Sequence, residues 1–196
     1  VGRVSGVEET ECTLHYQPQI RLKDRLLVGV DALLRWTHPE LGAGRPAEFI
    51  LVAESSGQIL GIGEWVLRTA LAQARQWRDA GHTELVVAVN LSMVQFRHPG
   101  LVDMVGRALA DSNVPPQMLE LELTESIAMD APEQVIAIVR QLYDLGVQLS
   151  IDDFGTGYSS FSYIQRLKVH KLKIDQSFVR HLGEDPSASH IVRAII

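Results

Sequence analysis

The stretch LELELT, residues 119–124, alternates leucine with a polar residue throughout its length. Successive side chains of an extended strand point to opposite faces, so Leu119, Leu121 and Leu123 share one face and Glu120 and Glu122 share the other. We expect the leucines to pack against helices. The glutamates would then point to the inner side of the sheet.

The segments around this strand repeat the order strand, helix, strand. Predicted strands cover residues 85–90, 119–124, 147–152 and 170–175, and predicted helices cover 101–113, the segment from Asp130 to Gly146, 159–167 and a segment that opens at Asp185. Pro132 and Glu133 are typical of a first helical turn. Such alternation is typical of an α/β fold with a parallel sheet.

Before residue 85, the pattern predicts strands at 14–20 and 26–35, a long loop, and a helix over 61–80 that Gly81 ends. We therefore expect a (β/α)8 TIM-like barrel. Such a barrel needs about 250 residues, so the chain would stop before the last strands. A doubly wound open sheet is the structural alternative, although no G-x-G-x-x-G motif follows the first strand.

The amino-acid composition limits which kinds of ligand and cross-link this chain is expected to have. The formal net charge of −6 argues against a DNA or RNA polymer as ligand. Cys12 is the only cysteine, so no disulfide framework is expected.

The chain begins at Val1 and breaks off within an apolar helical pattern at Ile196, so we interpret residues 1–196 as one domain of a longer protein. We expect this domain to be cytoplasmic, whether or not the parent protein is anchored in a membrane.

Polar side chains recur at the ends of successive predicted strands, where the chemistry of a (β/α) barrel is found. They are Asp31 and Arg35, Asn90, Glu122 and Glu125, Asp152 and Asp153, and Lys173 and Asp175. Solvated faces of edge strands are the other interpretation. That interpretation explains one strand better than it explains several strands of a sheet covered by helices.

A cluster of carboxylates removed from water needs positive charge nearby. Oxygen ligands suit Mg²⁺ or Mn²⁺, and Asn90 adds a neutral oxygen to the acids. At a strand end the chain turns, so Asp152 and Asp153 can both point into one site, with Asp152 bridging two ions and Asp153 holding the second. Two metal ions about 3.5–4 Å apart form a clamp for in-line displacement at phosphorus.

Several longer motifs occur in a specific order. They are YQP (16–18), VGVDALLRW (28–36), FILVAESSGQILGIGEWVL (49–67), VNLS (89–92), LELTES (121–126), DDFGTGYSS (152–160) and KLKIDQSFV (171–179). With these motifs the chain resembles the EAL domains of bacterial cyclic di-GMP phosphodiesterases. The resemblance implies a barrel with an antiparallel first strand, two Mg²⁺ or Mn²⁺ ions, and hydrolysis of cyclic di-GMP to linear pGpG.

The resemblance also implies roles for individual residues. The metal ligands would be Asp31, Asn90, Glu122, Asp152 and Asp153. Lys173 would contact the nucleophilic water, with a simple ion pair to one of the acids as its alternative role. Glu125 would support the loop after the fifth strand. Gln17, Arg35 and Asp175 would bind substrate, Arg35 at a phosphate. A homodimer through the helix after the fifth strand, and tethering to sensory or diguanylate-cyclase-like domains, are further expectations.

One residue that differs from the family motif bears on whether the domain is an enzyme or a receptor. Asp31 stands where the motif has glutamate, and its side chain is shorter by about 1.5 Å. Family members that lose this acid outright often serve as receptors, which bind cyclic di-GMP without cleaving it. The chain also ends before the family's later glutamate. Three functions therefore stay open. They are a cyclic di-GMP phosphodiesterase, a receptor for cyclic di-GMP, and a barrel enzyme that acts on another phosphate or a sugar.

Overall fold

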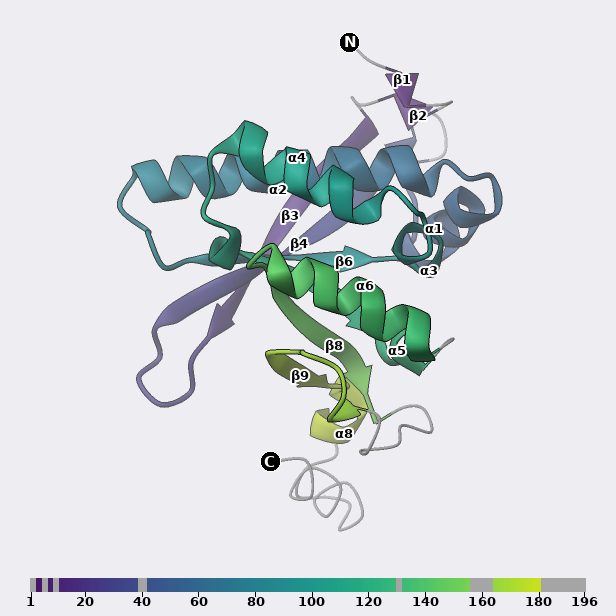
Figure 1. Cartoon of the computed structure of the whole chain (residues 1–196). Helices are drawn as coiled ribbons and strands as arrows, with labels where there is room; N and C mark the ends of the chain where they lie inside the picture. Colours follow the sequence, from purple (N-terminus) through teal and green to yellow (C-terminus); the bar gives the residue numbers. More distant parts are fainter. Residues whose placement is uncertain are drawn as a thin grey trace.

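The computed structural model describes residues 3–4, 7–8, 11–38, 42–129, 132–155 and 164–180. Figure 1 shows a curved sheet with helices along its outer side. The strands are β1 (Arg3–Val4), β2 (Val7–Glu8), β3 (Cys12–Ile20), β4 (Leu27–His38), β5 (Gly42–Ala43), β6 (Val86–Leu91), β7 (Leu119–Thr124), β8 (Gln148–Phe154) and β9 (Lys171–Ile174). The helices are α1 (Pro46–Ser55), α2 (Ile59–Asp79), α3 (Met93–Phe96), α4 (Leu101–Ser112), α5 (Glu125–Met129), α6 (Pro132–Asp144) and α8 (Gln176–Arg180), with a 3₁₀ turn, η2 (Pro116–Met118).

The main sheet follows the order of the chain. Its strands lie in the order β3-β4-β6-β7-β8-β9, and β5 pairs with β4 beside this path. β3 and β4 are antiparallel, whereas β4, β6, β7, β8 and β9 are parallel neighbours. The predicted α/β fold with an antiparallel first strand is therefore confirmed.

The core lies between the sheet and the helices. α2 contacts β6 and α4, and α6 contacts α4 and β8 (Figure 1). Leu119, Leu121 and Leu123 are fully buried, as the alternation in β7 predicts. Parallel strands bring their carboxyl ends to one edge of the sheet. This arrangement places the polar residues at those ends close together.

The prediction of a long loop before residue 61 was wrong in part, because α1 occupies the second half of that segment. Apolar residues occupy both faces of α1: Phe49 and Ala53, one turn apart, are buried, while Leu51 and Val52 are each 65% exposed. Pro46 at its first position and Glu48 in its first turn are the local signs of a helix start. The short helices α3, α5 and α8 were not predicted either, since a single turn is too short to show periodicity.

Two predicted helices fall mostly or wholly outside the described residues. They are the helix over 159–167, of which 164–167 are described, and the one that opens at Asp185. Asp130, the predicted helix cap, also lies outside them, but α6 begins at Pro132 as predicted. In the described part of the chain, no helix combines the length and apolar character needed to cross a membrane.

Candidate active site

The polar strand ends surround one pocket of about 410 Å³. β3, β4, β6, β7, β8 and β9 each contribute a side chain to it. The lining includes most of the predicted site residues, namely Gln17, Asp31, Asn90, Glu122, Asp152, Asp153, Lys173 and Asp175. Residues separated by more than 150 positions in the sequence thus form one acidic pocket, in the geometry expected for the carboxyl ends of barrel strands.

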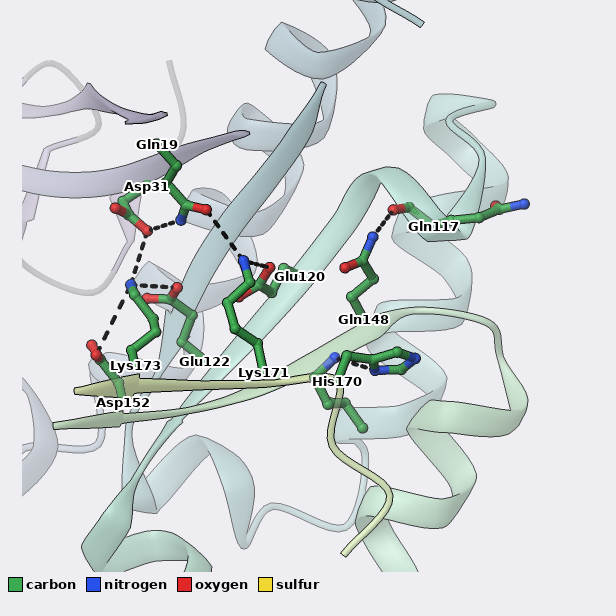
Figure 2. A network of polar contacts seen from close by, with 11 residues as sticks. Gln19, Asp31, Gln117, Glu120, Glu122, Gln148, Asp152, His170, Lys171 and Lys173 are labelled. Carbon is green, nitrogen blue, oxygen red and sulfur yellow. Dashed lines mark hydrogen bonds and ion pairs between the residues drawn. The ribbon is translucent and has the colours of Figure 1, made fainter. Parts of the chain in front are cut away.

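Lys173 lies at the centre of this acidic pocket (Figure 2). Its Nζ donates to Glu122 Oε1 at 2.6 Å and to Asp31 Oδ1 at 3.0 Å. Asp152 Oδ1 lies 4.0 Å from the same Nζ. The simple ion pair considered for Lys173 is therefore present, and it joins several acids instead of one.

Burial shifts the pKa values of the central pair. The Glu122 side chain is fully buried. Burial raises the pKa of Glu122 from 4.5 to about 7, although Lys173 opposes this rise. Burial alone would lower the pKa of Lys173, but the charges of Glu122 and Asp152 outweigh burial and raise it. Lys173 thus stays charged, while ionising Glu122 carries a cost in free energy.

The two adjacent aspartates reach the same pocket because the backbone turns between them. Asp153 has a φ of 54°, in the left-handed region, which non-glycine residues adopt uncommonly. The pairing of β8 with β9 is also irregular between Ile151 and Phe154. In a regular strand the two carboxylates would face opposite sides of the sheet. Burial, followed by the charges of Asp152 and Asp175, raises the pKa of Asp153.

Glu125 begins α5 directly after β7 and does not line the acidic pocket. Its Oε2 accepts a hydrogen bond from the Gly155 backbone N–H at 2.9 Å, and the residue is 3% exposed. Gly155 has a φ of 103°, and a Cβ at this position would lie 2.9 Å from the Phe178 ring. Glu125 and Phe178 together hold the chain where it leaves β8. The predicted supporting role of Glu125 fits this contact.

Arg35 faces a second, largely apolar pocket of about 390 Å³. This pocket shares Leu33 and Asn90 with the acidic pocket, so the two are neighbours. The Arg35 Nη1 donates to the backbone carbonyl of Leu34 at 2.8 Å. The structure therefore places Arg35 beside the acidic pocket and outside its lining.

Comparison with known proteins agrees with this arrangement. The family model for the EAL domain matches residues 4–196. This chain belongs to the EAL domain family. Over 191 residues, or 97% of the chain, it is 47% identical to the bifunctional diguanylate cyclase/cyclic di-GMP phosphodiesterase MucR of Pseudomonas aeruginosa and 37% identical to the cyclic di-GMP phosphodiesterase PdeR of Escherichia coli.

The chain spans 28% and 29% of the lengths of these two proteins. A solved structure described as the PaMucR phosphodiesterase in complex with c-di-GMP superposes with a TM-score of 0.91 at 47% identity. The match covers 95% of this chain and 75% of that one. This EAL domain thus shares its fold with that structure.

The donors in the acidic pocket of this EAL domain have the chemistry that a hard divalent cation requires. They are carboxylate oxygens and the side-chain oxygen of Asn90. Glu122 Oε2 is buried and has no hydrogen-bond partner in the described part of the chain, which is costly unless a cation binds it. In the present arrangement of the described residues, no three acidic, His or Cys side chains are grouped as a metal site. In the described part of the chain, the Lys173 ammonium lies within 4.0 Å of three of these carboxylates.

A second polar layer, which the sequence patterns did not indicate, lies below the acidic pocket. Lys171 Nζ donates to Glu120 Oε2 at 2.7 Å and to Gln19 Oε1 at 3.2 Å (Figure 2). Glu120 was predicted to point inward, but no role was assigned to it or to Lys171. Gln19 was not considered, although it follows Gln17 by two residues and so shares its face of β3.

Proposed function

We propose that this EAL domain is a metal-dependent phosphodiesterase that hydrolyses cyclic di-GMP to linear pGpG. The observation that carries the proposal is the acidic pocket. It gathers the carboxylates, an amide oxygen and a charged lysine at one edge of the sheet. The names of the relatives MucR and PdeR support cyclic di-GMP as the substrate.

Two Mg²⁺ or Mn²⁺ ions fit this donor set. Asp31, Asn90, Glu122, Asp152 and Asp153 would hold them. When bound, such ions lower the pKa of a coordinated water and neutralise charge on the phosphate. The unpartnered Glu122 oxygen and the raised pKa of Glu122 both indicate a carboxylate that positive charge would stabilise.

The hydrolytic step joins a water oxygen to phosphorus and breaks the bond from phosphorus to the ribose O3′. The water loses a proton, and the leaving O3′ gains one, so the product carries a 5′-phosphate and a 3′-hydroxyl. Lys173 provides an ammonium at the centre of the pocket. There it would donate a hydrogen bond to the attacking water and hold it in line with the leaving group.

Substrate would extend from the acidic pocket into its apolar neighbour. The Arg35 guanidinium is suited to a phosphate, which it can bind through two parallel hydrogen bonds. Leu33, Ile50 and Met93 line the apolar pocket and would accept a guanine base. Gln17 and Asp175 line the acidic pocket from β3 and from the end of β9, where they would contact the rest of the ligand.

A receptor that binds cyclic di-GMP without cleaving it is the second candidate function. The substitution of aspartate for the motif glutamate at position 31 favours it, because the shorter side chain extends less far into the site. The enzyme is favoured by the rest of the pocket, since a receptor has no use for the full set of carboxylates and Lys173.

The parent protein is proposed to carry further domains. The chain spans less than a third of MucR, whose name includes a diguanylate cyclase. Tethering to sensory or diguanylate-cyclase-like domains, in a protein that acts in the cytoplasm, would explain this difference in length. Homodimerisation through the helix after β8 stays a prediction, since most of that helix lies outside the described residues.

The proposal is tested by incubating the intact protein with cyclic di-GMP and Mn²⁺ and separating the guanine nucleotides by chromatography. We expect pGpG from the wild type and none from Lys173→Met, with cyclic di-GMP bound by both. Binding without any pGpG from the wild type would establish the receptor. Absence of both binding and hydrolysis would overturn both candidates.

A further inference from the structure

Gln19 links the acidic pocket to the second polar layer (Figure 2). Its Nε2 donates to Asp31 Oδ1 at 2.7 Å, and its Oε1 accepts from Lys171 Nζ at 3.2 Å. Lys171 in turn pairs with Glu120, which is 1% exposed, at 2.7 Å. The amide of Gln19 therefore lies between a carboxylate and an ammonium, with each end facing the charge that suits it.

These two charges fix the orientation of the Gln19 amide. A rotation of 180° would place its carbonyl oxygen against the Asp31 carboxylate and its NH₂ group against the Lys171 ammonium. Both contacts would then be repulsive, because a carboxylate only accepts hydrogen bonds and an ammonium only donates them. Hydrogen bonds to charged groups are also stronger than neutral ones. The NH₂ group of Gln19 is thus held toward Asp31.

The backbone beneath Gln19 leaves room for this side chain. Gly29 is the residue opposite Gln19 in the pairing of β3 with β4, and the register shifts just after Gln19. A Cβ on Gly29 would lie 3.2 Å from Gln19 Oε1 and 3.0 Å from the backbone oxygen of Val86. A larger residue at position 29 would press on the Gln19 amide. The glycine therefore leaves room for the Gln19 amide beside Asp31.

We propose that Gln19 is a positioning residue that orients the Asp31 carboxylate for metal binding. The inference rests on the proposed function, in which Asp31 is a metal ligand. Gln19 and Lys173 both contact Oδ1 of Asp31, so neither side chain engages Oδ2. Fixing one oxygen fixes the direction of the other. A short aspartate at this position gains most from such a constraint, because it extends less far into the site than the motif glutamate.

The test is Mn²⁺ affinity of the intact protein, measured by calorimetry without nucleotide, in wild type and Gln19→Met. Methionine keeps the length of glutamine and removes both hydrogen bonds. Loss of a side chain that orients a metal ligand weakens metal affinity by about 10–100-fold. We expect a loss of about tenfold here. Gln148→Met is the matched control, since Gln148 donates to the carbonyl of Gln117, remote from Asp31. Its Mn²⁺ affinity should equal that of the wild type.

A double-variant comparison separates positioning from a general loss of structure. In an Asp31→Asn background, Gln19→Met should weaken Mn²⁺ binding no further, because the carboxylate that it orients is gone. Gln19→Asn keeps the amide but is too short by about 1.5 Å to reach Asp31, so it should also weaken Mn²⁺ binding. This second variant keeps the polarity of the site and serves if Gln19→Met does not fold.

The inference is overturned if Gln19→Asn and a folded Gln19→Met bind Mn²⁺ like the wild type, or if the loss persists in the Asp31→Asn background. It is also overturned if the wild type does not bind Mn²⁺. A wild type that binds Mn²⁺ but fails to hydrolyse cyclic di-GMP would refute the enzyme while leaving this inference to be decided by the affinities alone.

Discussion

Replacing Glu122 with glutamine should stabilise the metal-free protein while removing the proposed hydrolysis of cyclic di-GMP. The Glu122 side chain is fully buried, and its pKa is raised from 4.5 to about 7, first by burial. One pKa unit corresponds to about 1.4 kcal/mol, so keeping Glu122 ionised in the folded state costs roughly 3 kcal/mol. Glutamine has nearly the same shape and no charge, so Glu122→Gln should remove most of that cost at pH 8.

The pH dependence has a definite sign. Because the folded pKa of Glu122 lies above its unfolded value, the folded state binds more protons between about pH 4.5 and 7. The contribution of Glu122 to stability therefore falls as pH rises through this window and is constant above it. In the Glu122→Gln variant, residue 122 does not titrate, so this decrease in the free energy of unfolding should be absent. The two proteins should have similar free energies of unfolding near pH 4 and differ most at pH 8.

The assay is thermal unfolding in EDTA across this pH range. For a chain of this size, roughly 3 kcal/mol corresponds to an increase of about 6–12 °C in melting temperature at pH 8. Glu64→Gln is the control, since its carboxylate is 45% exposed and its ion pair with Arg68 contributes little. A Glu122→Gln variant that melts below the wild type at pH 8 would show that the ion pair with Lys173 outweighs burial, and would refute this reasoning.

Other substitutions test separate parts of the account. Asp31→Glu should raise turnover, mainly by lowering the Mn²⁺ concentration needed, and slower hydrolysis than wild type at every concentration would show that the site is built around aspartate. Asp152→Asn should abolish production of pGpG, and a wild-type rate would mean that the metal ligands are wrongly assigned. Gly63→Ala should lower the melting temperature, because a Cβ there would overlap the buried Gln95 amide. Gly106→Ala should leave the melting temperature unchanged or raise it, since the nearest atom to its new Cβ would lie 4.0 Å away.

Much of the fold follows from local patterns that dominate the packing. The alternation in β7 assigns leucines to the helices and glutamates to the interior, and the structure buries Leu119, Leu121 and Leu123 accordingly. α1 was missed because apolar residues lie on both of its faces, with Phe49 and Ala53 buried and Leu51 and Val52 exposed, so the sequence shows no clear amphipathic pattern. The short helices α3, α5 and α8 each follow a strand and are too short to show helical periodicity, so the sequence alone did not indicate them.

The composition of the acidic pocket could be predicted because a parallel sheet brings the ends of its strands together. The ion pairs and hydrogen bonds within the acidic pocket could not be predicted in this way. That Lys173 would contact Glu122 and Asp31 at once depends on side-chain reach across three strands. The contribution of Gln19 depends on the register of β3 against β4 and on the space beside Gly29, neither of which a single sequence specifies.

Hydrolysis of cyclic di-GMP by the intact protein, measured with Mn²⁺ binding in one titration, tests the central claim most directly. The account predicts no pGpG in EDTA and a rate that rises with the occupancy of the metal site. Both signals should be lost together in Asp152→Asn. Equal hydrolysis in EDTA would contradict the metal-dependent site. Full Mn²⁺ occupancy and cyclic di-GMP binding without pGpG would contradict the enzyme.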